Sequence, residues 1–475
     1  MAELSRNFLK GVMNKDLDPR LIPDGSYRDA LNIDVIHAEG SDAGAARNKL
    51  GNTKISDLGN VSGQLIENCR TIGATTSETD NLLYYIVASD KFDGVYEYSE
   101  ITGNISRILQ ANKATPTTAS KLGLDKDFYI TGINFLDGFL YWTDNLNPPR
   151  RIKVERARAY SIDDDRIDDD ISVILAPPLH APMIDMLEET QQENNLEEKF
   201  VQFSYRYKYV DGQYSSMSPF SGVAFVPGDY ELDYGAGENK AMLNIKNKVS
   251  ITFRTGGVLV EDIELLVRDT KNLNVSIVES FNKYQIGIGD NGVYSFDFAN
   301  SKTYTTLQNS QVTRLFDNVP LKAKAQEIID RRIIYGNYLQ FYDIKDSLGS
   351  DILIDYTVGY VSKATPVETP IQTFRSDRDM EVAIQYGDGY GRFSTPLTSK
   401  ENTVYIPPLQ STTGNSLRVD ITNKPPAFAT HYRLVIKQSK GKYYNIFPIL
   451  YYADGMYRYF LVNAFDKEKI IVGEY

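Results

Sequence analysis

Residues 130–154 read ITGINFLDGFLYWTDNLNPPRRIKV, and this stretch predicts three short antiparallel strands. The dipeptide Asp137-Gly138 favours a two-residue turn, because both central positions need a positive φ and glycine supplies one without strain. Residues 139–143 leave the turn as an aromatic, β-favouring strand that contains the chain's single tryptophan, Trp142. Residues 150–154 then alternate charged and apolar side chains and begin a third strand. Such a unit predicts one blade of a β-propeller, with an ordinary meander in a β-sandwich as the alternative.

A second unit of the same kind precedes this stretch, in residues 67–110. It contains four β-favouring runs within about 44 residues, the length expected of a propeller blade. These runs are 70–75, 81–88, 94–98 and 105–109. Two consecutive units of one shape strengthen the propeller interpretation.

The chain has 475 residues, 42% of them hydrophobic and 24% charged, and a net charge of −12. This composition is that of a globular protein with room for about three domains. The excess of acid disfavours a surface that grips nucleic acid, because such surfaces exchange counterions for Lys and Arg. The single Cys69 excludes an intrachain disulfide framework. The first residues lack the features of a signal peptide, and no apolar run approaches a membrane span, so we expect a soluble protein made in a cytoplasm.

The remaining segments predict an all-β chain in which propeller blades are interrupted by two immunoglobulin-like or fibronectin-like β-sandwich domains. Alternating strands with Asp-Gly turns occur at 199–300 and again at 377–460, so a blade followed by a sandwich is repeated. The predicted parts are an N-terminal arm (1–24), propeller blades (25–160), an acidic and proline-rich linker (161–198), a first sandwich (199–311), a returning blade (312–350) and a second sandwich (351–475). Residues 1–24 are expected to form a short helix or an arm followed by an extended linker, and a short polar helix is expected at residues 183–196. The chain ends at Tyr475 in what reads as a cut strand, and we expect it to continue.

Residues that could carry chemistry are few. The three histidines, His37, His180 and His431, are far from Cys69 in sequence, and no pair of them has metal-ligand spacing. No Gly-x-Ser-x-Gly elbow is present. Residues 287–292 spell Gly-x-Gly-x-x-Gly, but they lie between strands with no helix following, which disfavours a dinucleotide site. We therefore expect no catalytic, cofactor-binding or metal-ligating residue.

Three further features each have a functional and a structural interpretation. The acidic run 163–170 could bind Ca²⁺, although a solvated acidic loop fits better because the glycine and terminal glutamate of an EF-hand loop are missing. The alternating Tyr205, Tyr207 and Tyr209 could stack on sugars, but core or subunit interface is the commoner role. Arg150-Arg151 could pair with carboxylates of a neighbouring subunit, whereas such charges more often cover a blade surface.

Four stretches resemble one protein family, the large tail proteins of short-tailed bacteriophages, especially the muzzle or nozzle proteins of crAss-like phages. They are LDPRLIPDGSYRDALNIDV (17–35), DAGAARNKLGN (42–52), YWTDNLNPPRRI (141–152) and RIIYGN (332–337). YWTD alone also occurs in receptor propellers, but those carry disulfide-rich neighbours that a single cysteine does not permit.

The resemblance implies a virion structural protein, assembled in the host cytoplasm, that forms a ring at the distal end of the tail. A hexamer is the stoichiometry implied, with tail hub or ring proteins and tail fibres as further partners. The ring would line and gate the DNA ejection channel, and an acidic lumen would let genomic DNA pass without specific binding.

Two other classes of protein stay open from the sequence. A β-propeller that binds or cleaves host-surface glycans would bring acids and aromatics together in one pocket. A propeller scaffold of a bacterial surface system would normally carry a signal peptide.

Overall fold

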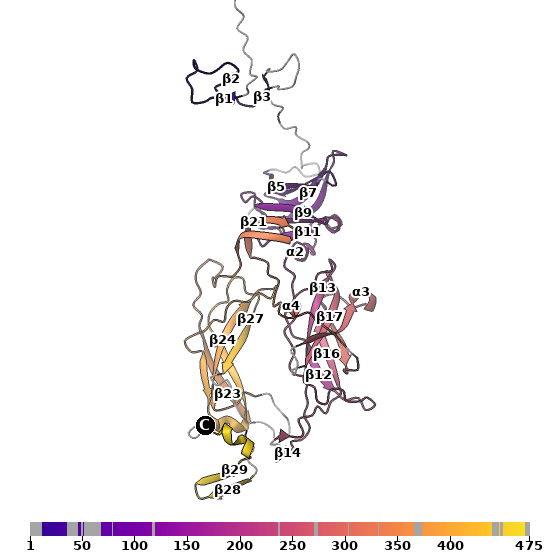
Figure 1. Ribbon diagram of the computed structural model, residues 1–475, viewed down its shortest axis with the longest axis vertical. Coiled ribbons are helices and arrows are strands. Elements are labelled where there is room, and N and C mark those ends of the chain that lie inside the picture. Colours follow the sequence, from indigo (N-terminus) through magenta and orange to yellow (C-terminus); the bar gives the residue numbers. More distant parts are fainter. Residues whose placement is uncertain are drawn as a thin grey trace, which may run out of the picture. The chain divides into compact units, whose positions relative to one another are not determined.

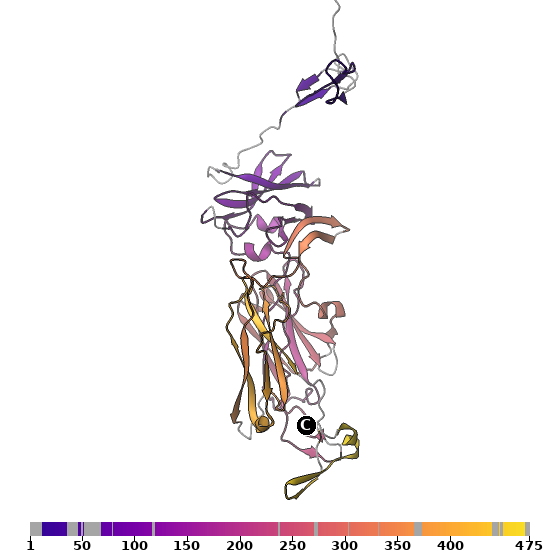
Figure 2. The ribbon, with the colours of Figure 1, turned by 90° about the vertical axis from the view of Figure 1, so that its left-hand side faces the viewer.

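The structure is a computed structural model that describes residues 12–35, 46–48, 51, 68–77, 79–115, 119–235, 238–269, 274–302, 304–330, 332–364, 373–438, 446 and 450–470. It is all-β, with 45% strand and 7% helix, and its small sheets do not close into a barrel within those residues (Figures 1 and 2). The predicted fold class is thus confirmed at this level. Contacts divide the chain into two compact units, residues 1–66 with 101–105 and residues 67–100 with 106–475.

The first unit contains two pairs of very short strands. β1 (Val12–Met13) lies parallel to β2 (Ser26–Tyr27), and β3 (Ile33–Val35) is antiparallel to β4 (Ala46–Asn48). The helix expected in the arm is wrong at residues 12–13, which are extended, and its earlier part lies outside the described residues.

The second unit begins with two meandering sheets. The first has the strand order β5-β6-β7-β8, formed by Arg70–Ser77, Leu82–Ala88, Phe92–Ser99 and Ile105–Asn112. The second has the order β11-β10-β9, formed by Arg150–Lys153, Phe139–Thr143 and Gly132–Leu136. Asp137 and Gly138 connect β9 to β10 with φ values of 51° and 80°, so the predicted two-residue turn is confirmed. The four strands predicted in 67–110 are all present.

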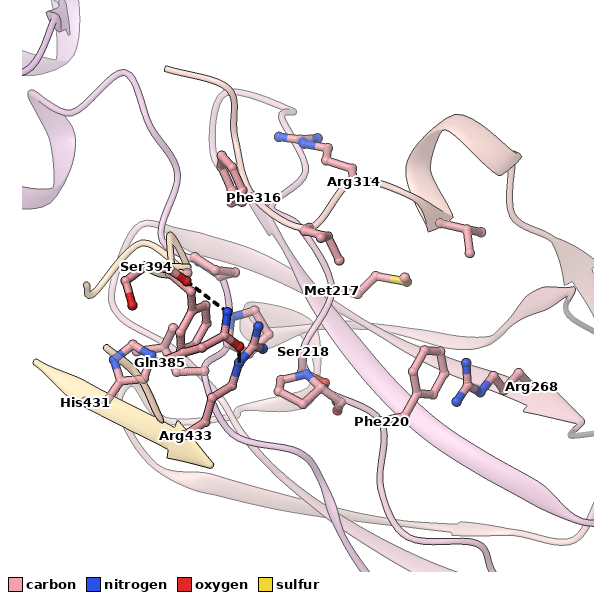
Figure 3. Close-up of a pocket in the computed structure, with 18 residues that line it drawn as sticks. Met217, Ser218, Phe220, Arg268, Arg314, Phe316, Gln385, Ser394, His431 and Arg433 are labelled. Carbon is pink, nitrogen blue, oxygen red and sulfur yellow. Dashed lines mark hydrogen bonds between the residues drawn. The ribbon is translucent and has the colours of Figure 1, made fainter. Parts of the chain in front are cut away.

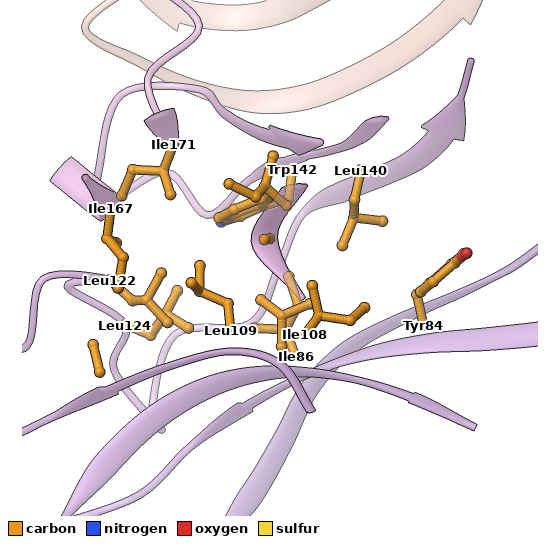
Figure 4. Packing of buried hydrophobic residues seen from close by; sticks show 14 of the residues in the cluster. Tyr84, Ile86, Ile108, Leu109, Leu122, Leu124, Leu140, Trp142, Ile167 and Ile171 are labelled. Atoms are coloured by element: carbon orange, nitrogen blue, oxygen red, sulfur yellow. The ribbon is translucent and has the colours of Figure 1, made fainter. Parts of the chain in front are cut away.

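One hydrophobic core joins these two sheets (Figure 4). Trp142 and Leu140 of β10 are fully buried and pack with Ile86 of β6 and Ile108 of β8. The side chains of Ile167 and Ile171, at the two ends of a short helix, close the core on one side. The sequence pattern around Trp142 therefore marks the centre of this core, which is held by burial of large apolar surface.

A hairpin from much later in the chain packs against the same sheet. β21 (Lys322–Ile329) and β22 (Arg332–Leu339) form this hairpin, and β21 lies beside β9 and β10 (Figures 1 and 2). Thr143 Oγ1 donates a hydrogen bond to the Ala323 carbonyl oxygen at 2.7 Å, and Gln326 Nε2 donates to Asn134 Oδ1 at 2.9 Å. The segment predicted to return to the blades after residue 311 thus contacts β9 and β10.

Two sheets packed on one core follow in residues 183–306. Their orders are β12-β16-β19 and β13-β17-β18-β20. The strands are β12 (Met183–Leu187), β13 (Val201–Tyr209), β16 (Lys248–Arg254), β17 (Val260–Asp269), β18 (Val275–Asn282), β19 (Val293–Phe298) and β20 (Thr305–Thr306). We call this part the first sandwich. The helix expected at 183–196 is wrong at 183–187, because β12 pairs antiparallel with β16 and alternates half-buried with exposed side chains.

A second pair of sheets, the second sandwich, has the orders β23-β26 and β25-β24-β27. Its strands are β23 (Tyr356–Ala364), β24 (Arg378–Gly387), β25 (Thr403–Ile406), β26 (Thr413–Ile421) and β27 (His431–Gln438), and a separate hairpin, β28 (Leu450–Asp454) with β29 (Tyr457–Leu461), follows. The remaining elements are β14 (Leu232–Asp233), β15 (Glu238–Asn239), α1 (Val154–Ala157), α2 (Ile167–Asp170), α3 (Lys283–Ile286), α4 (Asn309–Val312), η2 (Pro408–Thr412) and η3 (Ala464–Lys469). Among the described helices, none has the length and apolarity needed to cross a membrane.

A buried charge cluster connects the sheet around Trp142 to the first sandwich. Arg156 of α1 forms ion pairs with Asp170 of α2 and with Asp211, which follows β13, the latter at 2.6 Å. Arg151 of β11 lies 3.6 Å from the same Asp211 carboxylate and donates a hydrogen bond to Gln213 at 2.9 Å. The interpretation of Arg151 as a charge covering a blade surface is therefore wrong, because this side chain is only 5% exposed.

We predict that Gly132→Ala separates β21 from β9. A Cβ at position 132 would lie 2.7 Å from Gln326 Cβ and 2.9 Å from the Gln326 backbone nitrogen, and backbone cannot move aside cheaply. Overpacking of this kind typically costs about 1–3 kcal/mol. Chemical unfolding should show the loss, while Gly359→Ala in β23, where nothing lies within 4 Å, serves as the matched control. Equal unfolding midpoints for the two variants would contradict the close contact.

We also predict that Asp211→Ala lowers the free energy of unfolding by about 3 kcal/mol, because it leaves the buried Arg151 and the partly buried Arg156 without this carboxylate. Urea unfolding followed by tryptophan fluorescence would report the change near Trp142. Glu279→Ala, which removes an exposed ion pair with Lys302, should leave the midpoint nearly unchanged. A loss no greater than that of the control would show that the charge cluster contributes little.

Candidate functional site

A cleft of about 520 Å³ is lined by residues from several distant parts of the chain (Figure 3). The first sandwich contributes Met217, Phe220 and Arg268, and the second contributes Phe393 and Arg433. Connecting segments complete the lining with Pro177, Pro178, Leu179, Val312, Arg314, Leu315 and Phe316. Three arginines and His431 line this cleft and no carboxylate does, although the chain as a whole is acidic.

On the side of the first sandwich, Arg268 of β17 is stacked on an aromatic ring. Its guanidinium carbon lies 3.8 Å from the ring centroid of Phe220. Arg268 Nε and Nη2 donate to Gln202 Oε1 at 3.1 and 2.9 Å, and Gln202 Nε2 donates to the Ser221 carbonyl oxygen at 2.9 Å. The arginine is therefore held flat by a ring and by a neutral amide.

The second sandwich repeats this arrangement with different residues. The guanidinium carbon of Arg433 in β27 lies 3.8 Å from the ring centroid of Phe393. Arg433 Nε donates to Gln385 Oε1 at 2.9 Å, and Gln385 Nε2 donates to the Ser394 carbonyl oxygen at 2.8 Å (Figure 3). The two glutamines and the two arginines face each other across paired strands in both cases.

Serines hold both aromatic rings in position. Ser221 Oγ accepts a hydrogen bond from the backbone nitrogen of Phe203 at 3.0 Å, and Ser394 Oγ accepts one from that of Tyr386 at 3.1 Å. In each case the serine directly follows the stacked phenylalanine. These bonds fasten the segment that carries each ring to the edge of β13 and of β24.

His431 lines the cleft next to the ring of Phe393. Its Nδ1 is 3.0 Å from Thr430 Oγ1, and its ring meets that of Phe393 edge-on at a centroid distance of 5.1 Å. Burial lowers the pKa of the His431 imidazole, against the opposing effect of the Asp388 carboxylate. The neutral form is therefore favoured in the folded protein.

The features singled out in the sequence do not meet in this cleft, apart from His431. His180 is exposed, and His37 lies outside the described residues. Tyr205 and Tyr207 belong to the buried core of the first sandwich, as the structural interpretation predicts. The loop 287–292 follows the one-turn helix α3 and is held by Thr255 Oγ1, which donates to the Gly289 carbonyl oxygen at 2.7 Å.

The acidic run 163–170 uses its carboxylates within the protein. Asp163 accepts from the backbone nitrogen of Asn112 at 2.6 Å, Asp165 pairs with Lys121 at 2.7 Å, and Asp170 accepts from the Tyr160 hydroxyl at 2.8 Å. The Arg166 guanidinium holds the pKa of the Asp164 carboxyl below its usual range. Within the described residues, His, Cys, Asp and Glu form no cluster of three or more that could hold a metal ion.

The cleft residues escaped prediction because they meet only after folding. Gln202 and Arg268 are far apart in sequence, and so are Gln385 and Arg433. The one local signal was the recurrence of an aromatic residue followed by serine at 220–221 and 393–394. Chemically, the cleft offers guanidinium groups, aromatic rings and a neutral imidazole, which suit an anionic or aromatic group.

One family of known proteins matches most of this chain. The model of the Crassvirus muzzle protein family matches residues 3–309, well over half of the chain. The chain belongs to this family. The match shows the predicted resemblance to the muzzle proteins of crAss-like phages to be correct.

Curated proteins and solved structures give no further relative that informs on function. Among curated proteins, none matches the chain. A solved structure, the extracellular domain of the one-component system BT4673 from B. thetaiotaomicron, is 10% identical over 77% of this chain and 50% of that chain. The TM-score is 0.13, so this similarity carries no information about the fold. The chain spans half the length of that solved chain.

We predict that acid destabilises the protein partly through His431. Its folded pKa lies below the unfolded value of about 6.5, so the unfolded state binds the proton first as the pH falls. The stabilising contribution is thus present above pH ~6.5 and is lost as the pH falls toward the folded pKa. Thermal unfolding between pH 7.5 and 5 should show a shallower pH dependence for His431→Gln than for the unchanged protein, and parallel curves would contradict this role.

Proposed function

We propose that this muzzle-family protein is a structural component of the phage tail that assembles into a ring at the distal tail end and lines the DNA ejection channel. The observation that carries the proposal is the family match over residues 3–309. We take the hexamer as the stoichiometry to test first. The other proposed partners are tail hub or ring proteins and tail fibres, with assembly in the host cytoplasm.

The proposed architecture for this role is the one predicted from the sequence, with propeller blades at 25–160 and 312–350 and two immunoglobulin-like sandwiches at 199–311 and 351–475. Contact of β21 with β9 and β10 supports a returning blade, since it joins residues almost 200 positions apart in one packed region. The paired sheets of residues 183–306 and 356–438 support the two sandwiches.

Net charge supports the channel role. At −12 the chain repels DNA on average, and without phosphate-neutralising contacts DNA would slide past the wall quickly. The arginine-lined cleft does not contradict this, because each guanidinium is stacked on a ring or paired within the protein.

A glycan-active propeller is the second candidate, and the cleft does not favour it. Glycoside hydrolysis requires two carboxyl groups about 5–10 Å apart around the scissile bond. The lining of the cleft contains aromatic rings and arginines without a carboxylate.

We predict closed rings in the purified protein and antibody labelling at the distal tip of virion tails. Light scattering gives the mass of the assembly, and negative-stain microscopy shows its closure. In a gel-shift assay at low salt, the rings should not retain double-stranded DNA. Strong, salt-sensitive DNA binding, or a solved ring whose lumen is lined with Lys and Arg, would overturn the channel role.

A further inference from the structure

The two sandwiches share the pairing of four strands, but among the described residues the second has no counterpart of β18, β19 or β20 and has an additional strand, β25, beside β24. In the first, β17 pairs with β13 and β18, and β16 pairs with β12 and β19. In the second, β27 pairs with β24 and β26 pairs with β23. The matching Gln–Arg–Phe arrangements equate β13 with β24 and β17 with β27. Within the described residues, no strand pairs with the outer edges of β26 and β27, where β19 and β18 would stand.

The chain supplies two strands in the right order. β28 and β29 follow β27, as β18 and β19 follow β17. Residues 292–300 read GVYSFDFAN and residues 455–463 read GMYRYFLVN, so β29 is the sequence counterpart of β19. The two stretches share a glycine at their first position, a tyrosine at the third, an aromatic residue at the fifth and an asparagine at the ninth.

The side chains of β29 are nevertheless exposed. In β19, Phe298 is 2% exposed, and Tyr294 and Phe296 pack against the core of the first sandwich. Their counterparts Leu461, Tyr457 and Tyr459 are 57%, 70% and 56% exposed. The same pattern that fills a core in one sandwich thus faces solvent after the other.

The hairpin that β29 forms with β28 has apolar side chains on both faces. Tyr452 and Tyr459 meet on one face at a ring distance of 6.4 Å, and Tyr451 and Phe460 meet on the other at 6.2 Å. An isolated two-stranded hairpin is at best marginally stable in water, and a contiguous exposed apolar patch marks an interaction site.

We propose that β29 of one copy adds to the outer edge of β26 in a second copy along residues 417–421, in the position that β19 holds beside β16. At Asn415, just before this stretch, the same edge already accepts a hydrogen bond from the backbone nitrogen of Phe374 at 3.0 Å. The core-facing residues Val249, Ile251 and Phe253 of β16 correspond to Leu417, Val419 and Ile421 of β26, two of which pack in the second core. Transferring the β16–β19 register places Leu417 opposite Leu461, Val419 opposite Tyr459 and Ile421 opposite Tyr457. Every core-facing pair is then apolar.

Charge complementarity supports the same register. On the solvent face of the first sandwich, Thr252 and Ser295 are paired across β16 and β19, with 2.8 Å between their hydroxyl oxygens. Their counterparts are Asp420 and Arg458, a carboxylate opposite a guanidinium, and in its own chain Asp420 forms an exposed ion pair with Arg418 of the same strand at 3.0 Å. In its own chain Arg458 donates to the backbone oxygens of Gly455 and Tyr457. Opposite charges at directly opposed positions stabilise an antiparallel pair.

A second copy fits better than the chain's own β26. Asn463, just after β29, donates from Nδ2 to the carbonyl oxygen of Gly235 at 3.2 Å, which ties the end of the hairpin to the turn between β14 and β15. In this register Leu450, Tyr452, Tyr457, Tyr459 and Leu461 lie on the core-facing side of the hairpin, and each, more than half exposed, would lose about 100 Å². The sum, roughly 500 Å², is more than half of one partner's share of a standard interface, and the backbone pairing of β29 with β26 adds to it.

The contact joins two different surfaces, so it is head-to-tail and closes into a ring where the rotation permits. It therefore rests on the proposed ring and assigns the subunit contact within it. Exchange of a matching element between copies is a low-cost route to such assembly.

Disulfide trapping tests the contact. In a Cys69→Ser background, one chain carries Asp420→Cys and a second, differently tagged chain carries Arg458→Cys. Mixing the two should give a covalent heterodimer on a non-reducing gel, with neither chain alone giving a product. Lys437→Cys on β27, paired with Arg458→Cys, serves as the mismatched control and should give none.

The possible results of this experiment distinguish a failure of the β29–β26 contact from a failure of the proposed ring. A chain carrying both Asp420→Cys and Arg458→Cys that closes an internal disulfide, while the mixture gives none, would show that β29 completes its own sandwich and overturn the exchange. Rings in light scattering without any trapped product would overturn the contact and leave the ring standing. If neither rings nor a trapped product form at high protein concentration, both the proposed ring and the proposed contact are wrong.

Discussion

The carboxylate of Asp211 is the constraint on which the association of the two β regions depends. It is buried between Arg151 and Arg156, and these come from strand and helix on the side of Trp142, whereas Asp211 follows β13. A charge taken out of water is costly unless it is paired, so each partner requires the others in place. The cluster thus favours one docking of the regions over looser ones, a specificity that apolar contacts alone provide poorly. Asp170 pairs with the Arg156 guanidinium as well, so that this side chain is held by two carboxylates.

The same device, an arginine fixed by several partners, recurs in the cleft in a neutral form. Arg268 and Arg433 each rest on a phenylalanine and bond to a glutamine, so neither requires a carboxylate. Repetition of this geometry in two sandwiches, down to the serine that follows each ring, shows that the duplication extends to single hydrogen bonds. It also explains how an acidic chain keeps a carboxylate-free cleft lining, because Arg268 and Arg433 are held by rings and amides and Arg314 pairs with Asp317, which does not line the cleft.

Features fixed by neighbouring residues were predictable from the sequence, and those fixed by distant residues were not. The turn at Asp137-Gly138 follows from the conformational freedom of its own two residues, and the burial of Trp142 follows from the apolar run around it. β12 was missed because its exposed face carries the apolar Met183 and Leu187, which hides the alternation with the half-buried Ile184 and Met186 until the strand lies beside β16. The partnership of Arg151 with Asp211 and the meeting of Gln202 with Arg268 depend on chain paths that periodicity does not encode. The domain boundaries and the propeller topology remain predictions.

The hairpin β28–β29 shows how local preference and global need can differ within one segment. Locally, Asp454-Gly455 followed by alternating aromatics pairs the two strands with each other, as in any short hairpin. Globally, the counterpart strand β19 fills a sheet, and the apolar residues of β29 repeat those that β19 buries. A monomer satisfies the first preference and leaves the second unmet, exposing aromatic surface that water disfavours. Neighbouring copies arranged head-to-tail would satisfy both, because the hairpin could stay paired within its own chain while its outer edge and faces complete the next sandwich. The exposed aromatic residues of the hairpin would then become buried only when copies of the chain assemble.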